Sequence, residues 1–268
     1  MNEQKKQVHD FWNKNSCGEE LYLDSKSVEG FKKEQKIRYE LEPYILPFLN
    51  IGSLKDKKVL EIGVGLGADH HQLSMLGGQM FGIDLTERAI KNTKTRFEKL
   101  NINSKLIVAD AEKLPFKNEY FDYIYSWGVL HHSPNTQTAI NELHRVLKKG
   151  GKSRIMIYHK YSLVGIMLWF RYALLKLKPL LNLSYIYSNY LESPGTKAYT
   201  INESKIMFNK FKSVDIKIEL SQGDLLTDDV GQRHKGLILK VAKMIWPTFL
   251  VKKLFKNYGL FMLISVEK

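Results

Sequence analysis

The chain has 268 residues, of which 44% are hydrophobic and 12% aromatic, a composition that can build a core and excludes wholesale disorder. Its net charge of +13 makes it strongly basic, and its single cysteine, Cys17, excludes an internal disulfide framework and indicates a reducing, cytoplasmic compartment. The polar residues 1–20 lack the apolar stretch of a signal peptide, and no run of about 18 uncharged apolar residues predicts a membrane span.

Residues 1–50 are predicted to form a helical cap. The stretch "VHDFWNKNSCGEELYL" (8–23) mixes aromatic and polar side chains, and a helix is expected around residues 28–42. The simplest interpretation is an ordinary N-terminal helix that packs on the sheet that follows.

Residues 51–160 alternate between apolar, strand-like runs and helical segments. Strands that are separated by helices require parallel crossovers, which predict an open, doubly wound α/β sheet. Ligands of such sheets bind outside the carboxyl ends of the strands. The expected strands cover 57–63, 79–85, 105–110, 121–130 and 152–159, and the expected helices cover 68–78, 86–102 (with Thr86 as N-cap) and 135–151.

Three glycines, Gly63, Gly65 and Gly67, alternate in "LEIGVGLGADHH" (60–71), where the first strand turns into a helix. Glycine allows a tight turn and removes the Cβ that would keep a ligand from the backbone. The helix N-terminus offers N–H groups to a carboxylate or phosphate. The spacing is G-x-G-x-G, not the G-x-G-x-x-G of dinucleotide folds, so the alternative to a ligand site is a structural turn.

Two acidic residues end the next two strands. The carboxylate of Asp84 can accept two hydrogen bonds from a ribose diol. Asp110 can accept one from the exocyclic amine of adenine, while the N–H of Ala111 donates to a ring nitrogen. Either acid alone is typical of a loop cap, but their combination with the glycine turn favours a nucleoside site.

The chain resembles the class I S-adenosylmethionine-dependent methyltransferases, in particular the small-molecule type, over residues 57–160. The motifs that carry the resemblance are "VLEIGVGLG", "GIDLTERAI", "VADAEKLPFKNEYFDYIYSWGVLHH" and "ELHRVLKKGG". The resemblance implies a Rossmann-like, seven-stranded sheet with an antiparallel last strand, and S-adenosylmethionine as cofactor. It is nearly silent on the methyl acceptor.

The resemblance also implies roles for individual residues. Glu61 and the backbone at Gly63 and Gly65 would hold the methionine end of the cofactor. The N-terminal segment would fold over the cofactor, with Trp12, Tyr22 and Arg38 closing the site. The remaining implied cofactor contacts are Asp84 and Leu85 at the ribose, Asp110 and Ala111 at the adenine, and Ser126 and Trp127 beside the reacting methyl.

Methyl transfer from a sulfonium depends mainly on alignment, which can contribute about 7–11 kcal/mol to lowering the barrier. A base is needed only if the acceptor loses a proton. The candidate bases are His131 and His132 after the fourth strand, His159 at the end of the fifth strand, and Tyr22 in the cap. The alternative for the histidine pair is packing, since one of two adjacent side chains is expected to turn away. No metal site is predicted, because the histidine pairs are adjacent rather than spaced i, i+4.

Beyond residue 160 the regular alternation of strand-like and helical segments is interrupted. A helical insertion is expected over 161–200, and its first part is apolar nearly all round. Residues 201–220 are expected to return to the core as a helix, which opens with a capping box of Thr200 and Glu203, and a strand. A second, basic insertion (221–257) precedes the last core strand (258–268).

Two segments that overlap the insertions hold the whole charge excess. Residues 151–191 contain six basic residues and residues 233–256 contain seven, and neither stretch contains an acidic one. Trp169 and Trp246 are therefore expected in a lid over the carboxyl ends of the strands. The segments are interpreted as a lid with a solvated basic face, as a peripheral membrane contact, or as a site for an anionic acceptor. Nucleic acid is disfavoured, because no recognition module is present.

The sequence as a whole predicts a methyltransferase that acts on a small or amphiphilic, lipid-like metabolite. The alternative is a non-enzymatic protein that binds S-adenosylmethionine or a membrane surface and retains the fold. The expected location is cytoplasmic or membrane-peripheral. The accepting atom stays open among oxygen, nitrogen, sulfur and carbon.

Overall fold

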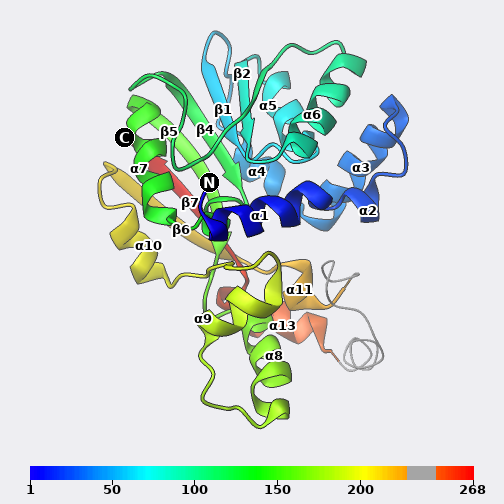
Figure 1. Ribbon diagram of the computed structural model, residues 1–268, viewed down its shortest axis with the longest axis vertical. Helices are drawn as coiled ribbons and strands as arrows, with labels where there is room; N and C mark the ends of the chain where they lie inside the picture. Colours follow the sequence, from blue (N-terminus) through cyan, green and yellow to red (C-terminus); the bar gives the residue numbers. More distant parts are fainter. Residues whose placement is uncertain (228–245) are drawn as a thin grey trace.

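The computed structural model describes residues 1–227 and 246–268, which form a twisted seven-stranded sheet covered by helices (Figure 1). The strand order is β3-β2-β1-β4-β5-β7-β6. Neighbouring strands from β3 to β5 are parallel, and β7 is antiparallel to both β5 and β6. This confirms the predicted fold and its antiparallel last strand. The strands are β1 Lys58–Ile62, β2 Gln79–Asp84, β3 Lys105–Val108, β4 Phe121–Trp127, β5 Leu147–Tyr158, β6 Ser213–Glu219 and β7 Phe261–Glu267.

The alternation of side chains along the central strands builds a core on each face of the sheet. Leu60 and Ile124 point to one face, which α7 and α10 cover, whereas Val59 and Tyr123 point to the other, which α4 and α5 cover. The helices are α1 Glu3–Lys14, α2 Glu19–Tyr22, α3 Val28–Leu41, α4 Ile45–Leu49, α5 Ala68–Met75, α6 Glu87–Lys99, α7 Thr136–Val146, α8 Leu163–Tyr172, α9 Leu183–Ile186, α10 Ile201–Met207, α11 Gln222–Leu225 and α13 Thr248–Leu254.

Two predicted helix caps are confirmed. The side chain of Thr86 accepts a hydrogen bond from the N–H of Ala89 at the start of α6. Thr200 and Glu203 form a reciprocal capping box at the start of α10. These caps fix where each helix begins next to a strand end.

Two predicted helix ends are wrong. The segment 147–151 belongs to β5 and not to the preceding helix, because Gly150 and Gly151 exchange backbone hydrogen bonds with Lys268 at the end of the chain. The apolar residues of the first insertion recur at helical spacing from Leu163 to Leu177, but α8 ends at Tyr172, and the chain continues as the short 3₁₀ turn η2 (Leu174–Lys176). The proline at position 179 disfavours helical backbone just before it.

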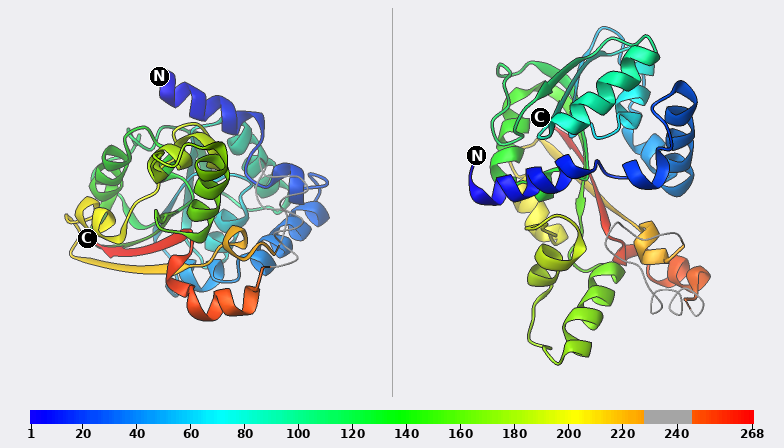
Figure 2. Two further views of the ribbon diagram at one scale, coloured as in Figure 1. Left: turned by 90° about the horizontal axis from the view of Figure 1, so that it is seen from below. Right: turned by 45° about the vertical axis from the view of Figure 1, so that its right-hand side comes forward.

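The described parts of the two insertions, residues 161–200, 221–227 and 246–257, form a lobe beyond the carboxyl ends of β4 and β5 (Figures 1 and 2). Val164 and Leu168 of α8 pack with Met156 and Tyr158 of β5. Trp169 donates to the carbonyl of Leu181 within the lobe. Within residues 1–227 and 246–268, no helix combines the length and hydropathy needed to cross a bilayer.

Candidate active site

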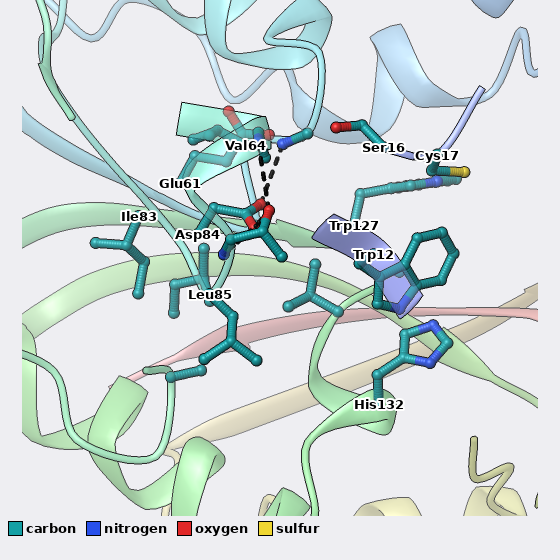
Figure 3. Close-up of a pocket in the computed structure, with 18 of the residues that line it drawn as sticks. Trp12, Ser16, Cys17, Glu61, Val64, Ile83, Asp84, Leu85, Trp127 and His132 are labelled. Atoms are coloured by element: carbon teal, nitrogen blue, oxygen red, sulfur yellow. Dashed lines mark hydrogen bonds between the residues drawn. The ribbon is translucent and has the colours of Figure 1, made fainter. Parts of the chain in front are cut away.

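A cavity of about 300 Å³ opens at the carboxyl ends of β1, β2 and β4, bounded by α1 and by the lobe (Figure 3). Its volume lies at the lower end of the range for small-molecule sites. The predicted site residues that line it are Glu61, Gly63, Gly65, Asp84, Leu85, Asp110, Ala111, Trp127 and His132, together with Trp12 and Arg38 of the N-terminal cap.

The three glycines of the first turn have different physical roles, although all have positive φ. A Cβ on Gly63 would lie 2.1 Å from a methyl of Val129, and one on Gly67 would lie 2.9 Å from Thr93. The missing side chains at these two positions thus make room for protein atoms. Only at Gly65 would a Cβ meet nothing within 4 Å. The open space for a ligand therefore lies at Gly65.

Asp84, at the end of β2, joins the second strand to the glycine turn. Its Oδ2 accepts a hydrogen bond from the N–H of Gly65 at 3.3 Å, and its Oδ1 accepts from the N–H and hydroxyl of Thr86 at 3.0 and 2.8 Å (Figure 3). Burial raises the pKa of this carboxyl, and the hydrogen bonds oppose that rise. Oδ1 already accepts two hydrogen bonds, but Oδ2 accepts only one, so its second lone pair can still accept from a ribose hydroxyl.

Asp110, after β3, is paired with a residue that sequence reasoning missed. Lys5 of α1 donates to Asp110 Oδ2 at 2.5 Å and to Glu112 at 2.7 Å. The other oxygen of Asp110 accepts from the N–H of Glu112. An adenine amine bound here would share Asp110 with Lys5, so α1 covers this end of the cavity.

Glu61, at the end of β1, is only 2% exposed and belongs to a buried polar chain. Its Oε2 lies 2.9 Å from Nδ1 of His70, whose Nε2 lies 2.7 Å from the hydroxyl of Ser104. Burial raises the pKa of Glu61 well above its usual value, with the Asp69 carboxylate adding to the rise. Burial lowers the pKa of His70 to about 3, so the imidazole is neutral.

Arg38 of α3 forms a buried ion pair with Asp69 at the start of α5. Its Nε and Nη2 donate to the two carboxylate oxygens at 3.0 and 2.7 Å. The hydroxyls of Tyr39 and Tyr125 donate to the same carboxylate. Although burial opposes ionisation, Arg38 holds the pKa of Asp69 below its usual value. The pair fixes the N-terminal cap against the glycine turn.

The outer part of the cavity has aromatic walls. Trp127 at the end of β4 packs edge-on against Phe261 of β7, with ring centroids 5.6 Å apart. Trp12 of α1 packs edge-on against His132 at 5.3 Å (Figure 3). Glu42 also lines this part, and burial raises the pKa of its carboxyl to about 7. The combination of aromatic rings and a carboxyl group in this part of the cavity suits an amphiphilic ligand.

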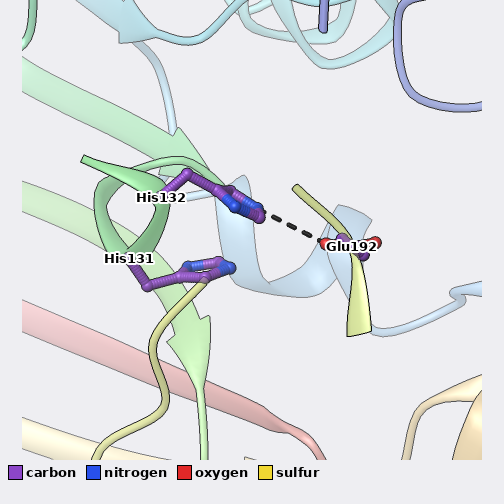
Figure 4. Close-up of side chains that lie close together, drawn as sticks. All are labelled: His131, His132 and Glu192. Carbon is purple, nitrogen blue, oxygen red and sulfur yellow. Dashed lines mark ion pairs between the residues drawn. The ribbon is translucent and has the colours of Figure 1, made fainter. Parts of the chain in front are cut away.

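Three polar side chains converge beside these aromatic walls (Figure 4). His131 and His132 lie in the 3₁₀ turn η1 (Leu130–His132), with ring centroids 4.3 Å apart, and both point toward Glu192 from the lobe. His132 Nε2 lies 3.4 Å from Glu192 Oε2, which accepts from the hydroxyl of Tyr158 at 2.7 Å. One ligand atom from each of the three residues lies within 4.8 Å of the others, a spacing that a cation could use.

The second nitrogen of His132 contacts two hydroxyls of the lobe. Nδ1 lies 2.8 Å from Ser193 Oγ and 3.1 Å from Thr196 Oγ1. The Thr196 hydroxyl donates to the carbonyl of Ser193, so its oxygen is left to accept a hydrogen bond from the N–H at Nδ1. On this assignment, Nε2 is the nitrogen without a proton.

Four predicted site residues lie outside the cavity lining. Ser126 is fully buried and donates to the carbonyl of Ile62. His131 lies behind His132, and neither of its ring nitrogens is hydrogen-bonded within residues 1–227 and 246–268. Burial lowers the pKa of His131 well below the usual value. His159 contacts the carbonyl of Gly259. Tyr22 lines a separate small depression beside α2.

Two observations of this structure indicate that the cavity fits S-adenosylmethionine. The open space at Gly65 lets a ligand approach the backbone, and Asp84 offers a buried carboxylate beside it. The side chains that sequence reasoning missed are Lys5, Tyr158, Glu192 and Phe261. No local pattern marks them, because each reaches the cavity from an element far away in the chain.

Residues 60–155 match the family described as a methyltransferase domain. A sterol 4-C-methyltransferase of Caenorhabditis elegans is 29% identical over 126 residues, which are 46% of this chain and 37% of that protein. A demethylmenaquinone methyltransferase of Geobacillus kaustophilus is 27% identical over 147 residues, which are 53% of this chain and 63% of that protein. The aligned parts thus cover less than two thirds of either relative.

Among solved structures, a phosphoethanolamine N-methyltransferase of Haemonchus contortus, in complex with phosphomonomethylethanolamine and S-adenosylhomocysteine, superposes with a TM-score of 0.62. The superposition covers 97% of this chain and 60% of that one, at 17% identity. At this identity the likeness shows the shared fold.

Proposed function

We propose that this chain, which carries a class I S-adenosylmethionine-dependent methyltransferase domain, transfers a methyl group from S-adenosylmethionine to a small or amphiphilic metabolite. The observation that supports the proposal most directly is the open space at Gly65 beside the buried carboxylate of Asp84. The Geobacillus and nematode relatives are named for a quinone and a sterol, and their lipid-like character agrees with the aromatic outer cavity.

When bound, S-adenosylmethionine supplies a methyl group that its sulfonium already activates for displacement. The residues of this chain would hold the donor and align the acceptor, which can contribute about 7–11 kcal/mol to lowering the barrier. Glu61 would face the cofactor's ammonium group, Asp84 its ribose and Asp110 its adenine. Leu85, Ala111 and Trp127 would pack along it, and Arg38 and α1 would keep water from the site.

On the acceptor side, we assign the proton acceptor to His132. Its Nε2 carries no proton on the assignment above, and it lines the cavity. The carboxylate of Glu192, 3.4 Å away, would stabilise the imidazolium formed when His132 takes a proton. Tyr158 fixes the carboxylate by its hydrogen bond.

The direct test is a screen of methyl acceptors with radiolabelled S-adenosylmethionine. Sterols, quinols, phospholipid headgroups and small amines would be offered, each with and without detergent. Label should move to one of these classes of small or amphiphilic acceptor. A protein that binds the cofactor tightly and labels no acceptor would favour the alternative, a non-enzymatic S-adenosylmethionine-binding protein.

Replacing His132 by alanine should lower turnover by about 10²- to 10⁴-fold while the affinity for S-adenosylhomocysteine stays the same. Glu192→Gln should also lower turnover, but by a smaller factor, because a neutral amide stabilises an imidazolium less than a carboxylate does. Single-turnover rates across pH, with calorimetry for the affinity, measure both effects.

The neighbouring histidine provides the matched control. His131→Asn should reduce stability, because the ring is fully buried, but turnover per folded molecule should stay near wild type. Treatment with a chelator should also leave turnover unchanged, because the proposal needs no ion at the three-residue cluster. If the His132 variant turns over as fast as wild type, His132 is not the base. If chelation abolishes activity, the three-residue cluster binds a metal ion and does not act as a base.

A further inference from the structure

The lobe carries apolar side chains on the side that faces away from the sheet. Val164 and Leu168 of α8 are buried against the core, whereas Ile166, Phe170 and Leu174 are exposed at i, i+4 spacing along the outer side. A helix that is apolar on both sides is typical of the interior of a protein or of a membrane. The part of the chain that the structure describes leaves this outer side uncovered.

The apolar stripe continues into the turn that ends the lobe, residues 174–180, called here the lobe tip. Leu177 is 90% exposed and Leu180 is 97% exposed. Leu177 has a left-handed backbone with φ of 56°, a conformation that favours glycine or asparagine at such a turn. A leucine here is strained and has its side chain in water, so fold stability does not explain its presence.

Positive charge surrounds these apolar residues. Arg171, Lys176 and Lys178 flank the lobe tip, and no acidic residue occurs between positions 151 and 191. The second insertion adds α13, which exposes Phe249 and Leu254, with lysines at 252, 253 and 256 and no acidic neighbour. Both segments lie on the underside of the molecule (Figure 2).

We propose that the lobe tip and α13 dock the protein on an anionic lipid surface. Leu177, Leu180 and Phe249 would enter the boundary between headgroups and acyl chains, and the lysines would face the lipid phosphates. A second copy of the chain is a poorer occupant, because a two-fold contact would bring the same cationic patches together. Nucleic acid would use the lysines but leave the leucines unexplained.

Docking there would bring the cavity close to the lipid. Glu192, at the cavity wall, follows directly on the helices of the lobe. A lipid-like acceptor could then reach the cavity without crossing bulk water. The docking itself needs no methyl transfer, so it can be tested apart from the proposed function.

Vesicle sedimentation tests the proposal with the full-length protein. Vesicles of phosphatidylcholine alone are compared with vesicles that also contain phosphatidylglycerol. Binding should require the anionic lipid and weaken steeply with salt, since the screening length falls from about 10 Å at 0.1 M to about 3 Å at 1 M ionic strength. No sedimentation with anionic vesicles at low salt would overturn the proposal.

Variants of the tip separate docking from folding. The double variant Leu177→Asn, Leu180→Ser should bind anionic vesicles at least about tenfold more weakly. Its melting temperature should not fall, because asparagine tolerates the left-handed backbone better than leucine. The matched control is Met75→Ser, Ile206→Ser, whose side chains are both 69% exposed on other elements, and it should bind like wild type.

Charge variants give the second arm of the test. The triple variant Lys252→Gln, Lys253→Gln, Lys256→Gln should bind more weakly and show a flatter salt dependence, with unchanged affinity for S-adenosylhomocysteine. The matched control is Lys32→Gln, Lys36→Gln on α3. Wild-type binding by both the leucine and the lysine variants would contradict the proposal. A concentration-dependent dimer that the leucine variant abolishes would assign the surface to a second copy instead.

Discussion

Replacing Arg96 by methionine is expected to lower the free energy of unfolding by about 3–5 kcal/mol, because it leaves a buried carboxylate without its partner. Arg96 is fully buried on α6 and donates to Glu34 at 2.7 Å. It also donates to Gln35 and to the carbonyls of Phe31 and Leu66. One side chain thus ties α6 to α3 and to the glycine turn. Urea unfolding of both proteins measures the loss.

The loss should depend on pH in a defined direction. Burial raises the pKa of Glu34, and Arg96 opposes that rise. Without Arg96 the folded variant would hold Glu34 protonated, while the unfolded chain releases the proton near its usual pKa. The variant is therefore least destabilised at low pH, and stability falls further as pH rises toward the raised pKa of the folded state.

A double variant separates the uncompensated charge from the lost packing. Arg96→Met combined with Glu34→Leu removes both charges and should recover part of the stability, most clearly at neutral pH. If the free energy of unfolding of Arg96→Met lies within about 1 kcal/mol of the wild-type value at neutral pH, Glu34 is hydrated or accepts from another donor in the variant.

The site residues that the sequence predicted are those whose positions follow from short local patterns. Gly65, Asp84 and Asp110 each follow a strand, and parallel strands bring their carboxyl ends to one edge of the sheet. A pattern of a few residues and one topological rule were therefore sufficient. The same reasoning misjudged Gly63, whose missing Cβ makes room for Val129, because sequence does not say which atoms will approach a glycine.

The acceptor side depends on contacts between distant segments. Glu192 meets His132 from 60 positions away, and Lys5 reaches Asp110 across 105. The lobe lies over the strand ends because it packs on Tyr158. No periodicity in the sequence predicts that contact. One of the two adjacent histidines was expected to turn away, and His132 lines the cavity whereas His131 does not, although the 3₁₀ turn brings both rings close to Glu192 (Figure 4).

Replacing Asp84 by alanine is expected to weaken the binding of S-adenosylhomocysteine from the micromolar range by at least about 10- to 150-fold. A ribose hydroxyl would lose its charged acceptor, which amounts to about 1.5–3 kcal/mol. The N–H of Gly65 and the hydroxyl of Thr86 would lose their partner as well, so the glycine turn itself would loosen. Isothermal calorimetry with the folded variant measures the loss.

Two milder variants divide this effect between its causes. Thr86→Val removes the hydroxyl contact to Asp84 together with the N-cap of α6, so it should lower stability but leave most of the affinity intact. Asp84→Asn keeps one oxygen as acceptor but not the charge, and it should fall between wild type and Asp84→Ala. If Asp84→Ala binds as tightly as wild type while its melting temperature drops, Asp84 serves the turn and not the ribose. The cofactor would then be held by Glu61 and Asp110, and the nucleoside site would need reassignment.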